Sequence, residues 1–169
     1  MIDPSAALST SAQIAVAIAG FAGVVAVFRN ESVHDWGRVE KFWLRLLLVN
    51  SILPLAFSVV GLLALAVSPA PSSVWRWCSA FAALFLFPYA AMILKNLLGF
   101  APGELRAAGG HHAASFTLYT LLGIVCVLQL YNAIALGAFW PFFAAIISLL
   151  LGAMYQFVRL VLIPQKPGA

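Results

Sequence analysis

The residues of this sequence that could do chemistry are polar side chains set within long apolar runs. Such groups usually face neighbouring helices, where they form hydrogen bonds between helices or line a path or a binding site. No acidic residue lies within the runs, which disfavours proton-coupled transport and cation conduction, because both usually use Asp or Glu inside the membrane. The candidates are Asn50, Tyr89, Asn96, Gln129, Asn132, Tyr155, Gln156 and Arg159.

No motif in the chain names a reaction. A Ser/His/Asp spacing, HExxH, a P-loop and GxGxxG are all missing, so we expect no enzyme and assign no cofactor. His111 and His112 adjoin two glycines, but adjacent residues point in different directions on most backbones. We therefore expect solvated histidines and no metal site. Cys78 and Cys126 lie in apolar runs without a CxxC spacing, and we expect them to be small core residues.

The composition predicts a protein that uses lipid as its solvent. Hydrophobic residues make up 64% of the chain and charged residues 8%, against about 45–50% and about 25% in soluble proteins. A soluble chain of this size buries only about 70% of its surface, so water would contact much of this apolar surface. The formal charge of +4 forms no basic patch, and we expect no nucleic acid as a partner. The expected partner is the lipid bilayer.

The apolar runs predict five membrane-spanning helices, at about residues 8–28, 42–67, 74–98, 114–136 and 141–163. The last two come from one stretch of about 50 residues, which would be about 75 Å long as a single helix. We expect this stretch to fold back between Gly137, which can end a helix, and Pro141, which can begin one. The fold class is therefore an all-α polytopic membrane bundle that occupies residues 1–169 as one domain.

The positive charges predict the orientation of the bundle. With five spans, one side holds only Arg76, and the other holds Arg29, Arg38, Lys41, Arg45, Lys95, Arg106, Arg159 and Lys166. Because Lys and Arg accumulate in cytoplasmic segments, the N-terminus is predicted outside and the C-terminus in the cytoplasm. Richness in Ala and Leu with short connections is typical of a bacterial cytoplasmic membrane protein.

The segment before the second span carries two further signals. Ser32 and Asp35 resemble a capping box with Asp in place of Glu, so a helix is expected to begin before the membrane does. Trp36 and Trp43 share one helical face, which suits anchoring among lipid headgroups.

Depth along the spans groups several of the polar residues on the cytoplasmic side. At 1.5 Å per residue, we expect convergence in the inner leaflet of a cluster formed by Asn50, Tyr89, Asn96, Tyr155, Gln156 and Arg159. Two interpretations stay open: the side chains join helices by hydrogen bonds, or they line a hydrated or ligand-binding cleft that opens to the cytoplasm.

The first span carries a helix-packing seam of small residues. The seam consists of Ala12, Ala15, Ala19, Ala22 and Ala26 at heptad spacing, with Gly23 beside them. Small residues let helix backbones approach closely. Their partner is either another span of the same chain or the same span of a second copy.

Three functional hypotheses follow from these features. The first is a non-catalytic structural or accessory subunit of a membrane complex, because the short soluble segments offer little surface for recognition. The others are a small oligomeric channel or carrier, and a membrane binder of an apolar ligand. Other membrane subunits or a homo-oligomer are the expected protein partners.

In size and span number the chain resembles the tryptophan-rich sensory proteins, which bind porphyrins and sterols. It lacks their Trp- and Pro-rich signature, and we assign no family.

Overall fold

The computed structural model describes residues 3–28, 36–67, 71–100 and 112–162, and these are helical apart from short connections. The elements are α1 (Pro4–Phe28), α2 (Arg38–Val67), α3 (Pro71–Leu98), α5 (His112–Tyr131), the π-helix η1 (Asn132–Leu136) and α6 (Phe139–Leu162). Five helical segments, with η1 continuing α5, are long and apolar enough to cross a membrane. The prediction of an all-α membrane bundle with five spans is confirmed.

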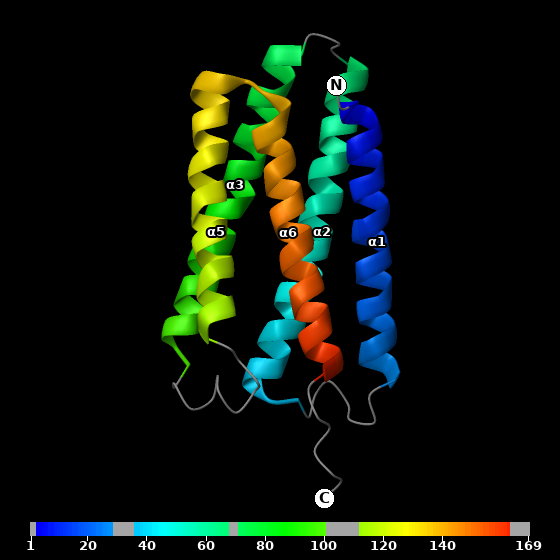
Figure 1. Cartoon of the computed structure of the whole chain (residues 1–169), viewed down its shortest axis with the longest axis vertical. Coiled ribbons are helices and arrows are strands. Elements are labelled where there is room, and N and C mark those ends of the chain that lie inside the picture. The colour runs from blue at the N-terminus through cyan, green and yellow to red at the C-terminus, as the bar shows by residue number, and fades with distance from the viewer. Residues whose placement is uncertain (1–2, 29–35, 68–70, 101–111, 163–169) are drawn as a thin grey trace, which may run out of the picture.

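The helices form a bundle with α6 in contact with each of the other four long helices (Figure 1). α1 lies at the edge of the bundle and packs against α2 and α6. We call the end at which α5 and α6 are joined the hairpin end, and the opposite end the basic end. Toward the basic end lie five of the described cations, Arg38, Lys41, Arg45, Lys95 and Arg159, whereas Arg76 lies toward the hairpin end.

All five helices begin earlier than the predicted spans, and at α1 and α2 a local cap accounts for the start. Asp3 accepts hydrogen bonds at 3.0 Å from the backbone N–H and the hydroxyl of Ser5, so α1 begins at Pro4. Glu40 accepts from the N–H of Gly37 at 2.9 Å, which is the reciprocal half of a capping box and begins α2 at Arg38. The box predicted at Ser32 and Asp35 lies outside the described residues.

The predicted fold-back between the last two spans is confirmed. Gly137 has a φ of 61°, which favours glycine, and its N–H donates to the carbonyl of Asn132 at 2.9 Å. The Asn132 side chain then holds the turn, since it donates to the carbonyl and accepts from the N–H of Ala138, each at 2.9 Å. It also donates to the Ser79 hydroxyl at 2.7 Å, which ties the turn to α3. Gln129 donates to the carbonyl of Pro141 at 2.6 Å.

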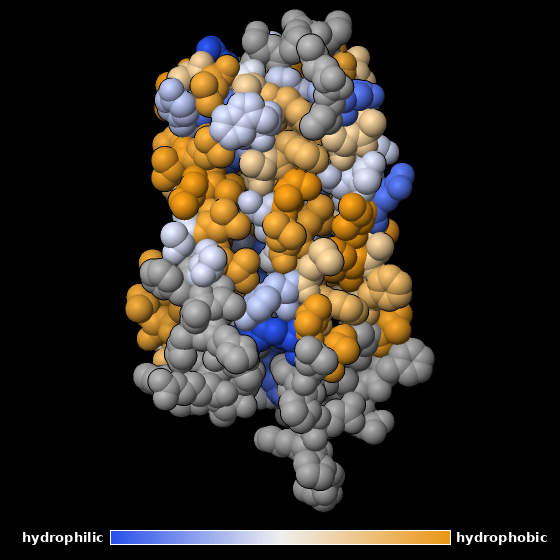
Figure 2. Space-filling model, viewed as in Figure 1, coloured by the Kyte–Doolittle hydropathy of each residue, from blue (hydrophilic) through white to orange (hydrophobic). Residues whose placement is uncertain are grey.

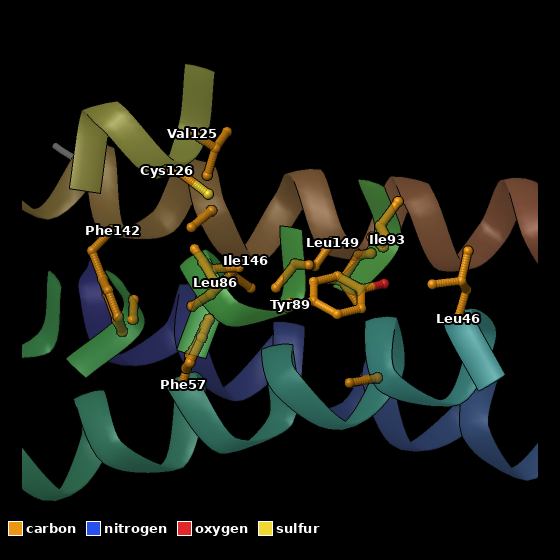
Figure 3. Close-up of a cluster of buried hydrophobic side chains, with 14 of the residues drawn as sticks. Leu46, Phe57, Leu86, Tyr89, Ile93, Val125, Cys126, Phe142, Ile146 and Leu149 are labelled. Carbon is orange, nitrogen blue, oxygen red and sulfur yellow. The ribbon is translucent and has the colours of Figure 1, made fainter. Parts of the chain in front are cut away.

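The core of the hairpin half is apolar and aromatic. Phe57, Leu86, Phe142 and Ile146 are fully buried there and come from α2, α3 and α6 (Figure 3). The ring centroids of Phe57 and Phe142 lie 6.3 Å apart. Cys78 and Cys126 are buried free thiols in this core, as predicted.

The packed face of α1 includes the described alanines of the predicted seam but not Gly23. Ala15 and Ala22 are buried, and Ala12 and Ala19 are half-buried; the side chain of Ala26 lies outside the described part of the structure. The prediction that Gly23 belongs to this face is wrong, because Gly23 is exposed and an added Cβ would meet nothing within 4 Å. Successive residues of a helix are rotated by about 100° about its axis, so Gly23 lies on a different face from its buried neighbour Ala22.

Candidate functional site

Three polar side chains from three helices form a buried hydrogen-bonded network in the basic half of the bundle. The Tyr89 hydroxyl of α3 donates to Oδ1 of Asn50 at 2.7 Å. Asn50 of α2 donates through Nδ2 to Oε1 of Gln156 on α6 at 3.1 Å. Each of the three residues is about nine-tenths or more buried. The network therefore fixes the positions of α2, α3 and α6 relative to one another.

A glycine on α6 makes room for this network. Gly152 lies one turn before Gln156, on the same helical face. A Cβ added at Gly152 would lie 3.0 Å from Nδ2 of Asn50, which is closer than ordinary van der Waals contact. The absence of a side chain at Gly152 thus lets the Asn50 amide lie against α6.

A cavity of about 40 Å³ adjoins the network. Because about 10–15 Å³ holds one water, it has room for two or three waters or for a small polar group. Figure 1 shows that α5 and α6 diverge from their joined ends toward the basic end, and Figure 2 shows hydrophilic side chains in a hollow between them on a largely hydrophobic face. The polar and aromatic lining comes from Trp43, Asn50, Tyr89, Tyr119, Ser148, Tyr155 and Gln156, and the apolar lining from Ile93, Leu118, Leu121, Leu122 and Leu149.

Two side chains that line the cavity carry polar atoms without partners. Within the described residues, neither the indole N–H of Trp43 nor the hydroxyl of Tyr155 has a hydrogen bond, and both atoms are buried. Trp43 is only 2% exposed. Burying such a group without a partner costs free energy, and most buried polar groups in proteins are therefore hydrogen-bonded. These two side chains are the strongest indication of a binding site in the described structure.

A buried arginine adjoins the same aromatic residues. Cζ of Arg159 lies 3.9 Å from the ring centroid of Trp43 and 5.6 Å from that of Tyr155, and Arg159 is 8% exposed. The guanidinium stacks on the Trp43 indole and adds positive charge next to the cavity.

The prediction that Trp36 and Trp43 anchor in lipid is wrong, since both are buried inside the bundle. Trp43 is buried because Arg159 and Phe42 pack against its ring.

The structure brings together five of the six predicted cluster residues and places one apart. Asn50, Tyr89, Tyr155 and Gln156 line the cavity, and Arg159 contacts its aromatic wall. Asn96 instead donates to the carbonyl of Met92 one turn back on its own helix, at 2.7 Å, and does not line the cavity.

Sequence reasoning missed Trp43 and Tyr119 as lining residues. A signal for Trp43 existed, because it lies two turns before Asn50 and hence on the same helical face. Tyr119 carries a weaker signal, because Ser115 is the one polar residue among those three or four positions away from it in the sequence. His34 and His111 and the side chain of His112 lie outside what the structure describes.

The arrangement can bind a ligand through hydrogen bonds, and no nucleophile with an adjacent base lines it. Among the described residues, no three His, Cys, Asp or Glu side chains lie close enough to hold a metal ion. Comparison of the chain with protein-family models, with curated proteins and with solved structures gives no match, so the chemistry of the cavity itself is the basis for its interpretation.

Proposed function

We propose that this protein is a non-catalytic membrane protein that binds the hydrogen-bond-accepting head of a lipid-soluble ligand in the cavity between α2, α3, α5 and α6. The observation that carries the proposal is a pair of buried donors, Nε1–H of Trp43 and Oη–H of Tyr155, which have no partners among the described residues and belong to side chains that line the cavity. A ligand oxygen between them would satisfy both.

The charge beside the cavity favours an acidic or carbonyl head over a cationic one. The guanidinium of Arg159 stacks on the ring of Trp43, so a cation in the cavity would face a like charge. An indole N–H can only donate a hydrogen bond, which again selects an acceptor. A carboxylate head, as in a long-chain fatty acid, fits both conditions.

The cavity is large enough for the polar head of a ligand but too small for a whole ligand molecule. A volume of about 40 Å³ is far below the roughly 300–1,000 Å³ of pockets that enclose a whole drug-sized molecule. The head alone would lie inside. An apolar tail would extend between the diverging α5 and α6, where Leu118, Leu121 and Leu122 contribute apolar surface.

A structural or accessory role is the second candidate. The observation that favours it is the hydrogen bonding of Asn50, whose amide oxygen accepts from Tyr89 and whose amide nitrogen donates to Gln156 without a ligand. The channel or carrier hypothesis gains no such support within one chain, because the fully buried side chains of Phe57, Phe142 and Ile146 fill the core between the cavity and the hairpin end.

A binding titration tests the proposed function. Purified protein in mild detergent is titrated with palmitate, with its methyl ester and with a hexadecyl amine, and complexes are counted by native mass spectrometry. We expect palmitate to bind most tightly and the amine least. Trp43→Phe and Tyr155→Phe each remove one donor and should weaken palmitate binding by about tenfold or more.

The matched controls for these variants lie at the hairpin end. Trp140 and Tyr131 are exposed there, so Trp140→Phe and Tyr131→Phe make the same chemical changes far from the cavity. Their palmitate affinity should equal that of the unaltered protein. Equal binding of the three probes, or equal affinity of all four variants, would reject the cavity as the site.

A further inference from the structure

α1 carries one amide side chain that forms no hydrogen bond within the described part of this chain. Gln13 is exposed, and its amide has no hydrogen bond with any described residue. Every other described Asn or Gln has at least one, namely Asn50, Asn96, Gln129, Asn132 and Gln156. Gln13 lies about 14 Å along α1 from Pro4, at 1.5 Å per residue, which is near the middle of the hydrocarbon in a spanning helix. Lipid offers this amide no partner, and membrane Gln residues usually bond across a helix interface.

The residues on the same face as Gln13 repeat at alternating spacings of three and four. We call this face the outer seam: it consists of Ala6, Ser9, Gln13, Val16, Gly20, Gly23 and Val27, all of which are exposed. This is the heptad spacing of two helices that pack with a left-handed crossing, and small or β-branched side chains permit close approach. The opposite face of α1, which includes Leu8, Ala15 and Ala22, is already buried against the chain.

The glycines of the outer seam have no role in packing within the described chain. A Cβ added at Gly20 or Gly23 would meet nothing within 4 Å. Glycine is among the least favourable residues in the interior of a helix, so two glycines on an open face need another reason. Close approach of a second helix backbone supplies that reason.

An apolar groove borders the seam. It lies between α1 and α6, has a volume of about 280 Å³, and presents no polar surface. Ile14, Ala17 and Phe21 of α1 and Met154 and Val158 of α6 line it. A helix seated on the outer seam could therefore place larger side chains in this groove.

We propose that α1 pairs with α1 of a second copy of this chain along the outer seam, and that the two Gln13 amides bond to each other. The strong bias of Lys and Arg toward one side gives all copies one orientation, so the two α1 helices run parallel. In a parallel two-fold pair, each seam residue meets the same residue of its partner at the same depth. An amide both donates and accepts, so Gln13 is complementary to itself. This inference does not rest on the cavity, because α1 does not line it.

Disulfide cross-linking of the full chain in lipid vesicles tests the pairing without disruptive changes. Ser9→Cys and Val16→Cys place small thiols on the seam, and Val127→Cys places one on the exposed face of α5. Oxidation should link the two seam variants into dimers and leave the α5 variant monomeric. The unaltered chain, whose Cys78 and Cys126 are buried, provides the background. Equal cross-linking in all three variants, or cross-links from the seam to another protein, would overturn the proposal.

The dissociation constant of the dimer can be measured in lipid vesicles. Labelled copies are diluted with lipid, and the energy transfer between them reports the fraction that is paired. Gln13→Leu should raise the dissociation constant by about three- to twentyfold, since it removes the membrane-buried hydrogen bonds. Gly20→Leu should raise it by about tenfold or more, because a bulky side chain prevents close approach. Gly123→Leu is the matched control, since Gly123 is also exposed with open space around it, and its pairing should be unchanged. A protein that stays monomeric at every dilution, or a dimer unaffected by both seam changes, would contradict the proposal.

Discussion

At the scale of single residues, Asn50 joins three helices, since it accepts from Tyr89 and donates to Gln156. Asn50→Leu keeps the approximate volume but leaves both partners buried without their bond. We expect it to lower the free energy of unfolding by about 1–2 kcal/mol, measured by thermal unfolding in mild detergent. Asn96→Leu removes only a bond within its own helix and should cost less. An equal loss in the two variants would contradict the central role of Asn50.

Gly152 acts on the same amide, and a double-mutant cycle can show this. Gly152→Ala places a Cβ 3.0 Å from Nδ2 of Asn50 and should displace the amide from Gln156. The change should therefore destabilise the unaltered protein but have little effect when Asn50→Ala has already removed the amide. Additive losses of unfolding free energy in the double variant would show that Gly152 acts through some other contact.

The polar cluster was predictable from the sequence only in part. Depth along each helix follows from residue counting, which is why Asn50, Tyr89 and Gln156 could be expected at one level. The rotation of each helix about its axis follows from the packing of large side chains, and no residue count supplies it. For that reason the burial of Trp43 and the separate position of Asn96 emerge only from the structure.

At the scale of elements, the hairpin of α5 and α6 depends on one side chain. Asn132 is fully buried and satisfies both backbone polar groups of Ala138 as well as bonding to Ser79. Asn132→Leu should lower the free energy of unfolding by about 2–3 kcal/mol, because several buried polar groups lose their partner. Gln129→Leu breaks a single bond to Pro141 and serves as the comparison, with a smaller expected loss. A variant of Asn132 as stable as the unaltered protein would show that the turn does not need this side chain.

The ends of some helices could be predicted from the sequence better than the ends of others. The turn between α5 and α6 followed from Gly137 and Pro141, whose backbone preferences act locally. The start of α1 did not, because Asp3 extends the helix by a polar cap outside the apolar run that defines the span. A helix was expected to begin before the second span, and α2 begins at Arg38, where Glu40 caps it. The packed face of α1 was also misjudged at Gly23, since small side chains occur on both sides of this helix.

At the scale of the whole molecule, the distribution of charge predicts the orientation. The basic end should lie in the cytoplasm and the hairpin end outside. Fusions of periplasmic and cytoplasmic reporters after Ala70, Gly110 and Ala169 test this, with an outside signal expected after Ala70 and cytoplasmic signals after the other two. A cytoplasmic signal after Ala70 would reverse the orientation, and with it the leaflet from which a ligand reaches the cavity.

The most direct test of the proposed binding site is an experimental structure of the protein purified from its membrane and solved in lipid. We predict density for a ligand head within about 3 Å of both Nε1 of Trp43 and Oη of Tyr155, with a tail that runs between α5 and α6. The same density should be lost when the protein carries both Trp43→Phe and Tyr155→Phe. A cavity closed by its own side chains, or one that holds only two or three waters in the unaltered protein, would contradict the account and leave the structural role as the function that the bundle supports.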